Sequence, residues 1–332
     1  MKINILKTGL LAAIQDSGRP ARLSDGVPSG GAADAVSHRI ANYMAGNGAG
    51  AATVEVSGGG FSALVMRSGW LACSGAGGAL FLDNIEIAGN RAFFVPEGSV
   101  LEIRPAPEGN YAYLAASGGW NVPEVLGSRS TCLPAGFGGL EGRALRKGDV
   151  LNAAGSPDDL EPSGQYGKIG TGKWFVPGLL PRMAANARII RVLPGPENGW
   201  WSEEDERRFF HTEFTVSAHR DRMGVRLDGP PFPPANQSIL LSTAVMPGTV
   251  QVPPGGQPIA LLADAQTTGG YPRIAQVIAV DIPRLAQIPA GQVIRFHKVT
   301  LEEAERLYFE QENLLRKIQF ALQFKLHERA NR

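Results

Sequence analysis

The sequence predicts a mostly β fold made of many short strands, and three observations support this prediction. Glycine and proline are frequent, with 42 Gly and 24 Pro among 332 residues, and both occur along the whole chain without a period. Short β-branched or aromatic runs recur between them, nearly all bounded by Gly, Pro, Asn or Asp. Few segments have helical periodicity. This pattern is typical of β-barrels and β-sandwiches.

The expected strands are short apolar or alternating runs at residues 1–7, 61–65, 92–95, 100–104, 111–115, 189–193, 214–217, 239–241, 259–262, 274–280 and 293–296. The apolar run at 10–14 is too short for a signal peptide. The long uncharged stretch at 242–263 contains four prolines, which argues against a membrane-spanning helix. We therefore expect a soluble, cytoplasmic protein without a membrane partner.

Three segments are predicted to be helical: 34–45, 202–210 and 301–327. In the first, apolar residues recur at helical spacing and Gly46 follows as a stop signal. The second begins after Ser202, a good N-cap residue. The third begins with a capping box formed by Thr300 and Glu303, and its apolar residues fall on one face. That face either packs on its own domain or binds a partner protein.

A polar segment rich in Pro and Gly at 155–164 marks a domain boundary. The predicted organisation is an N-terminal β-rich domain over 1–155, a linker over 156–185, a second β-rich domain over 186–298 and a C-terminal helix over 299–332. A strand followed by Gly-Gly-aromatic and then proline occurs at 113–123 and again at 260–272. This weak internal similarity favours two related halves, although chance also produces such patterns.

Charge and motif content exclude several functions. The net charge of +1 and the absence of basic clusters argue against a nucleic-acid partner. Two cysteines and five histidines without ligand spacing predict no metal site, and two cysteines fit a reducing compartment. Residues 167–174 nearly match a phosphate-binding loop, but Trp174 replaces its Ser or Thr and Pro177 prevents the helix that must follow.

Five segments contain more glycine and polar side chains than packing requires: 15–20, 127–131, 221–224, 248–253 and 266–272. Each is compatible with an ordinary β-turn, in which Gly takes positive φ and Asp or Thr satisfies backbone amides. Together they are also compatible with a pocket of backbone, Arg, Gln and Thr donors for a carboxylate, carbonyl or ureido group.

These segments resemble the signature blocks of one family, in the same order: Gln15-Asp-Ser-Gly-Arg-Pro20, Gly127-Ser-Arg-Ser-Thr131, Asp221-Arg-Met-Gly224, Gly248-Thr-Val-Gln-Val-Pro253 and Gln266-Thr-Thr-Gly-Gly-Tyr-Pro272. Members of this family are named as the second subunit of allophanate hydrolase, as the C component of 5-oxoprolinase or as biotin-dependent carboxyltransferases. The resemblance covers about residues 6–296. It implies cyclophilin-like β-barrel architecture, with the barrel over 186–298, and a sister chain similar to the B component of 5-oxoprolinase.

The resemblance implies three alternative functions. The first is the C component of an ATP-dependent 5-oxoprolinase, inactive alone, that opens 5-oxoproline to glutamate with a B component and a third, A component. ATP is then used by the complex and not clearly bound by this chain. The second is the carboxyltransferase component of a urea carboxylase, with biotin on a separate carrier. The third is a regulatory protein that binds its sister chain.

Both enzymatic alternatives act on a planar amide whose carbonyl oxygen gains negative charge, which requires fixed donors. The predicted catalytic residues are Arg222, Gln266 and Asp221, with Asp221 and Asp16 orienting neighbouring arginines or serving as a base. The predicted substrate-binding residues are Gln15, Asp16, Arg19, Arg129, Gln251, Thr267, Thr268, Gly269, Gly270 and Tyr271. We expect the loops at 15–20, 221–224, 248–253 and 266–272 to converge on one cleft. Arg220 and Ala21 depart from the family pattern, and Arg220 is expected to add charge at the pocket mouth.

Overall fold

The computed structural model describes residues 1–154, 176, 188–236 and 240–330, with side chains as far as 324. The chain forms two compact units that exchange segments. Unit 1 contains Met1–Gly18, Asp34–Leu179 and Asn313–Arg332, and unit 2 contains Arg19–Ala33 and Leu180–Glu312. The predicted linker at 156–185 lies outside the described residues except for Val176. No helix in the described part of the chain is long and apolar enough to span a membrane.

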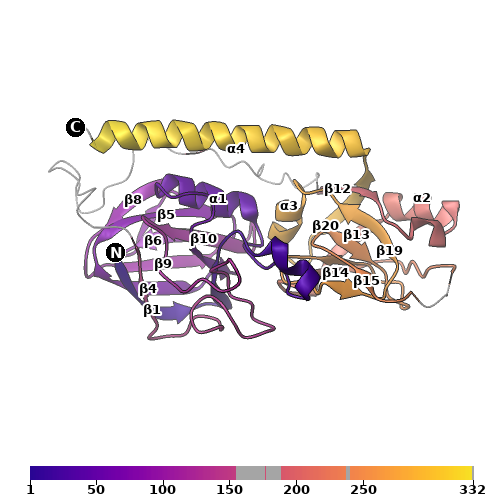
Figure 1. The fold of residues 1–332 in the computed structure, drawn as a ribbon, viewed down its shortest axis with the longest axis horizontal. Helices are drawn as coiled ribbons and strands as arrows, with labels where there is room; N and C mark the ends of the chain where they lie inside the picture. Colours follow the sequence, from indigo (N-terminus) through magenta and orange to yellow (C-terminus); the bar gives the residue numbers. More distant parts are fainter. Residues whose placement is uncertain (155–175, 177–187, 237–239, 331–332) are drawn as a thin grey trace. The chain divides into compact units, whose positions relative to one another are not determined.

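Unit 1 contains two antiparallel sheets and helix α1, and the second half of the C-terminal helix also belongs to it (Figure 1). One is a 6-stranded sheet in the order β11-β1-β4-β9-β6-β7, and the other is a 5-stranded sheet in the order β2-β3-β10-β5-β8. The elements are β1 (Lys2–Thr8), β2 (Leu11–Gln15), α1 (Ala35–Met44), β3 (Thr53–Ser57), β4 (Phe61–Arg67), β5 (Gly69–Gly75), β6 (Gly78–Leu82), β7 (Ile85–Ile87), β8 (Arg91–Val95), β9 (Val100–Pro105), β10 (Tyr111–Ala116) and β11 (Val150–Asn152).

The core of unit 1 is one apolar cluster to which both sheets contribute. Strand β1 contributes Ile3 and Ile5, while the alternate residues Lys2, Asn4 and Leu6 are partly exposed, as expected for a strand with one buried face. Helix α1 lies against β5 and β10. Its N-cap is Asp34, whose carboxylate accepts the backbone N–H groups of Val36 and Ser37 at 3.1 and 2.9 Å.

Unit 2 is a closed barrel with strand order β12-β19-β16-β17-β14-β13-β20, accompanied by a two-stranded ladder of β15 and β18. Its elements are the 3-10 helix η1 (Pro20–Asp25), β12 (Ile189–Pro194), the 3-10 helix η3 (Asn198–Trp200), α2 (Glu203–His211), β13 (Glu213–Arg220), β14 (Gly224–Asp228), β15 (Thr243–Ala244), β16 (Thr249–Gln251), β17 (Ile259–Leu261), β18 (Thr268–Gly269), β19 (Arg273–Val277), α3 (Ile282–Gln287) and β20 (Val293–Lys298). This mostly β architecture with a barrel confirms the predicted fold class.

Aromatic side chains fill part of the unit 2 core. Phe209 of α2 stacks on Phe296 of β20, with ring centroids 5.1 Å apart. Phe214 and Phe232 pack against Phe209 at 5.4 and 5.6 Å. All four side chains are fully buried. Phe209 is the residue that α2 buries against the barrel, and the ion pair of Glu206 with Lys298 of β20, at 2.9 Å, joins the same two elements.

The long C-terminal helix α4 (Leu301–Ala330) begins at the predicted capping box, where the Glu303 N–H donates to the Thr300 hydroxyl at 3.2 Å. At its start, Ala304 and Leu307 pack against a small apolar cluster of unit 2. The helices predicted at 34–45, 202–210 and 301–327 are confirmed by α1, α2 and α4. The strand predicted at 239–241 is wrong where the chain is described, since residues 240 and 241 lie outside any strand and Leu241 is exposed.

Candidate functional site

The loop after β2 contains Asp16, whose buried carboxylate is saturated with hydrogen bonds. Its Oδ1 accepts from the hydroxyls of Ser128 and Ser130 at 2.6 Å each, and from the Gly18 N–H at 2.8 Å. Its Oδ2 accepts from the backbone N–H of Arg129 at 2.5 Å. Charge-assisted bonds of this kind are strong. Asp16 therefore joins the loops at 15–18 and 128–131, and it orients the backbone of Arg129 rather than its guanidinium.

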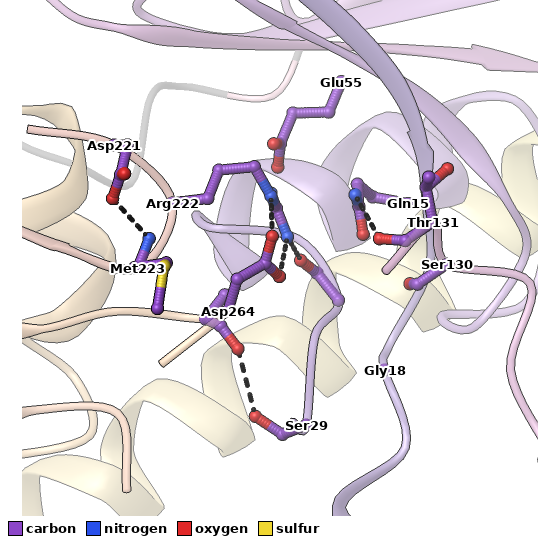
Figure 2. Close-up of polar contacts among 12 residues, drawn as sticks. Gln15, Gly18, Ser29, Glu55, Ser130, Thr131, Asp221, Arg222, Met223 and Asp264 are labelled. Carbon is purple, nitrogen blue, oxygen red and sulfur yellow. Dashed lines mark hydrogen bonds and ion pairs between the residues drawn. The ribbon is translucent and has the colours of Figure 1, made fainter. Parts of the chain in front are cut away.

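Gln15 lies beside this junction and is completely buried. Its Nε2 donates to the Thr131 carbonyl at 3.3 Å (Figure 2). Its Oε1 has no hydrogen-bond partner among the described residues. The Arg129 side chain, in contrast, is partly exposed and pairs with Glu124 at 3.3 Å. Gln15 is thus the member of this group with an unused buried polar atom.

Unit 1 also contains a buried polar network that the sequence did not reveal. The Tyr113 hydroxyl donates to Glu55 at 2.8 Å and accepts the Asp34 N–H at 2.7 Å. Burial and the adjacent Glu55 carboxylate raise the pKa of Tyr113 well above its usual value. His38 of α1 contacts the Thr53 hydroxyl at 3.0 Å, and burial lowers the pKa of His38 to about 4.

In unit 2, Arg222 forms a buried bidentate ion pair with Asp264 (Figure 2). Both bonds, from Nε and from Nη2, are 2.8 Å long, and Nη2 also donates to the Gly31 carbonyl at 2.7 Å. The backbone supports this pair, because the Asp264 N–H donates to the Arg222 carbonyl. Arg222 therefore binds together three segments of unit 2: the turn at 221–224, the segment at 262–264 and the backbone at Gly31.

Asp221 does not orient Arg222, so this part of the prediction is wrong. Its exposed side chain accepts the N–H groups of Met223 and Gly224 at 2.7 and 3.2 Å, which stabilises its own turn. Asp264 is the carboxylate that orients Arg222, and sequence reasoning missed it. The available signal was a single acid after the apolar run at 259–263.

Arg220 is also placed differently from the expectation that it adds charge at a pocket mouth. Its guanidinium donates to the carbonyls of Ala286, at 2.6 Å, and Ile288. These carbonyls lie at the C-terminal end of α3, where a cation is favourable. The predicted substrate residue Arg19 is 2% exposed and belongs to the same unit, where its N–H donates to the Ser29 carbonyl at 2.7 Å.

A second polar group surrounds Gly269. The side chain of Gln251 is buried, its Oε1 has no partner among the described residues, and it lies 3.2 Å from the position a Gly269 Cβ would take. The Gln266 Nε2 lies 3.5 Å from the same point. The structure thus brings together three predicted residues, Gln251, Gln266 and Gly269.

The remaining predicted residues of this loop are more exposed. Thr267 is half-buried, and its carbonyl accepts the N–H of Val245 at 3.0 Å. Thr268 and Gly270 are exposed, and Tyr271 is 44% exposed. Both ends of the loop are fixed, because β18 pairs with β15 and the Pro272 carbonyl accepts the Val252 N–H.

The predicted site residues are divided between the two units. Gln15, Asp16 and Arg129 belong to unit 1, whereas the other predicted residues belong to unit 2. The convergence of all four loops on one cleft stays a prediction. In the described part of the chain, no group of three or more His, Cys, Asp or Glu side chains has an arrangement that holds a metal ion.

Comparison with known proteins places these residues in a family context. The carboxyltransferase domain, subdomain A and B family matches residues 25–298. The C component of the Escherichia coli 5-oxoprolinase is 38% identical over 316 residues, which cover 93% of this chain and 97% of that protein. Its counterpart from Haemophilus influenzae is 36% identical over 305 residues, 92% of this chain and 94% of that protein.

A structural comparison gives a more distant relative. The crystal structure of the Kluyveromyces lactis urea carboxylase superposes with a TM-score of 0.84 at 27% identity. The match covers 96% of this chain and 29% of the urea carboxylase, so this chain corresponds to under a third of that enzyme. The chain belongs to the carboxyltransferase domain, subdomain A and B family.

Proposed function

We propose that this chain is the C component of an ATP-dependent 5-oxoprolinase that opens 5-oxoproline to glutamate. The observation that carries the proposal is the 38% identity with the C component of the Escherichia coli 5-oxoprolinase over nearly the full length of both chains. That relative is named as one part of a larger enzyme, and this chain accordingly works with B-like and A-like partner chains in the cytoplasm and is inactive alone.

The chemistry of the polar residues supports this proposal. Opening a lactam places negative charge on the carbonyl oxygen, and fixed donors stabilise that charge. Gln266 supplies an amide donor next to Gly269. Arg222 holds the segment before Gln266 through Asp264, two residues earlier in the chain. ATP is used by the complex, and the residues named here bind the amide.

Reconstitution tests the proposal. The chain is mixed with purified B-like and A-like chains from the same organism, and glutamate formation from 5-oxoproline is followed with and without ATP. We expect turnover only when all three chains and ATP are present. Turnover by this chain alone, or undiminished turnover when it is omitted, contradicts the proposal.

Gln266→Ala gives a residue-level test in the same assay. Removing one donor of this kind costs about 10²–10³ in rate, so we expect a loss of that size with unchanged assembly of the complex. Gln257→Ala is the matched control, because Gln257 is exposed on the same unit. A Gln266→Ala rate within about threefold of the wild-type rate contradicts a catalytic role.

The urea carboxylase similarity supports a second candidate, a carboxyltransferase component that acts on urea. Biotin then arrives on a separate carrier chain. Carboxyl transfer from carboxybiotin to urea is measured with the same preparation, and transfer in the absence of 5-oxoproline turnover favours this candidate. Tight binding of the sister chain without either activity favours a regulatory role.

A further inference from the structure

The Gln251 side chain is buried without a hydrogen-bond partner for its Oε1 among the described residues. The residue is only 4% exposed. A buried acceptor without a partner is unfavourable, and such groups are uncommon in native proteins. In contrast, Gln276 on the neighbouring strand β19 uses both amide atoms, donating to the Pro247 carbonyl and accepting from the Thr249 hydroxyl. Gln251 thus has an unused acceptor, whereas both amide atoms of Gln276 are bonded.

The backbone holds Gln251 in place on both sides. It lies at the end of β16, opposite Ile259 of β17 and Arg273 of β19. Because the strand is paired with both neighbours, the barrel fixes the direction in which the Gln251 side chain leaves the backbone. A fixed acceptor is suited to binding a ligand, since little freedom is lost when the ligand binds.

Two further polar groups lie around the same point. A Cβ on Gly269 would be 3.2 Å from the Gln251 Oε1 and 3.5 Å from the Gln266 Nε2, so an acceptor and a donor both lie beside the position where residue 269 has no side chain. Thr243 is opposite Gly269 in the β15–β18 ladder, and its hydroxyl is also buried without a partner in the described chain. An apolar atom, the Val245 Cγ1, lies 3.4 Å from the position of that Gly269 Cβ.

An acceptor and a donor near the same point match an amide whose N–H and C=O lie on one edge. In a five-membered lactam the ring forces the amide to be cis, so its N–H and C=O lie on one edge. An ordinary trans amide presents them on opposite sides, and an ester or lactone lacks the N–H. Urea presents the same edge as a lactam.

We propose that Gln251 determines specificity by accepting the N–H of a cis amide through Oε1 while the Gln266 Nε2 donates to its carbonyl. The substrate class is planar amides with N–H and C=O on one edge. This inference rests on the proposed function for its choice of 5-oxoproline as the ligand. The sequence predicted donors at this site, and the Gln251 Oε1 adds an acceptor to them.

A comparison of ligands tests the role of the N–H. The reconstituted complex is titrated calorimetrically, without ATP, with 5-oxo-L-proline and with its lactone analogue, 5-oxotetrahydrofuran-2-carboxylate. The analogue has oxygen in place of the N–H and differs little in shape. We expect the lactone to bind about 100-fold more weakly, because its ring oxygen faces the Gln251 acceptor and leaves it unpaired. Equal affinities for the lactam and the lactone overturn the inference before any variant is made. The absence of lactam binding overturns it as well.

Variants then assign the effect to Gln251. Gln251→Met keeps the shape and removes the acceptor, so the preference for lactam over lactone is expected to fall to about threefold or less. Gln251→Glu keeps an acceptor and is expected to retain the preference. Gln257→Met, an exposed glutamine on the same unit, is expected to behave as wild type. A folded Gln251→Met protein that keeps the full preference contradicts the inference.

Turnover is measured separately from binding, so the two proposals fail in different ways. A complex that binds the lactam selectively but forms no glutamate contradicts the 5-oxoprolinase function and leaves the role of Gln251 standing. A complex that turns over 5-oxoproline without discriminating against the lactone contradicts the role of Gln251 alone. Titration with urea under the same conditions shows whether the site prefers urea or the lactam, since both have an N–H and the C=O on one edge.

Discussion

Arg222 and Asp264 form the most deeply buried ion pair described in unit 2, with exposed side-chain fractions of 4% and 3%. Removing one partner of such a pair leaves a buried charge without compensation, which typically costs about 3–5 kcal/mol. We therefore expect Arg222→Met to lower the free energy of unfolding by about that amount, measured by urea denaturation. Loss of activity in this variant then reflects destabilisation as well as chemistry.

An exposed ion pair in the same unit provides the control. Arg295 pairs with Glu213 at 2.9 Å, and both side chains are at least half exposed. Exposed pairs contribute about 0–1 kcal/mol, so Arg295→Met is expected to change stability little. An Arg222→Met protein that is as stable as Arg295→Met contradicts a structural role for the buried pair.

His38 predicts a pH dependence of stability. Its pKa is about 4 in the folded protein, chiefly because of burial, against about 6.5 in an unfolded chain. The unfolded state therefore binds the proton first, and stability is lost as the pH falls from 6.5 towards 4. Between pH 7 and 5 this amounts to about 2 kcal/mol.

His38→Gln is expected to remove that part of the pH dependence, because an amide keeps polar contacts with the Thr53 hydroxyl and the Ala49 carbonyl without titrating. Urea denaturation at pH 7 and pH 5 measures the difference between the two proteins. Proton NMR of the His38 ring checks the cause directly. A ring that titrates near pH 6.5 in the folded protein rules out this explanation.

At the scale of elements, Arg220 stabilises α3 from the end of β13. Its guanidinium donates to the carbonyls of Ala286 and Ile288. Hydrogen bonds from a charged group contribute about 1.5–3 kcal/mol, so Arg220→Met is expected to lower unfolding stability by about 2 kcal/mol. Arg226→Met, on the exposed face of β14, is the control and is expected to change it by under about 0.5 kcal/mol. Equal stability of the two variants contradicts the capping role.

The helices were predictable where local signals were complete, and α3 shows why others were not. Ser202 and Thr300 are side-chain caps, and their signals lie within a few residues of the helix start. Helix α3 covers only six residues, includes Pro283, and has no side-chain cap at Asp281. Asp281 instead binds Arg191, 90 residues away, at 2.6 Å. Such a partner is set by tertiary packing and leaves no local signal.

The candidate site was predictable in its residue types but not in its pairings. Gln251, Gln266 and Gly269 lie together as expected. Asp264 was missed because its partner, Arg222, is 42 residues away and its immediate neighbours are apolar. Glu55 was missed because it occupies an alternating strand, where a polar residue normally faces solvent, yet it is 3% exposed and bound by Tyr113. Sequence periodicity does not reveal which polar side chains are buried together.

At the scale of the whole molecule, the exchange of segments between units has consequences for fragments. Arg19–Ala33 belongs to unit 2 although the rest of that unit begins at Leu180. The Gly30 N–H donates to the Ala263 carbonyl at 3.0 Å, and the Ser29 hydroxyl contacts the same carbonyl at 3.3 Å. The Gly31 carbonyl accepts from Arg222 at 2.7 Å. A fragment of residues 180–312 lacks all three bonds.

We expect that fragment to be less stable than the same unit supplied with a synthetic peptide of residues 19–33. Three hydrogen bonds at about 1 kcal/mol each predict a rise in melting temperature of roughly 10 °C at saturating peptide. A Gly30→Pro peptide is the matched control, since proline lacks the N–H that Ala263 accepts and cannot take the φ of +59° found at Gly30. If the fragment melts at the same temperature with either peptide or with none, residues 19–33 do not stabilise the barrel. A rise with the native peptide alone shows that a segment from the first tenth of the chain completes a unit built mainly from its second half.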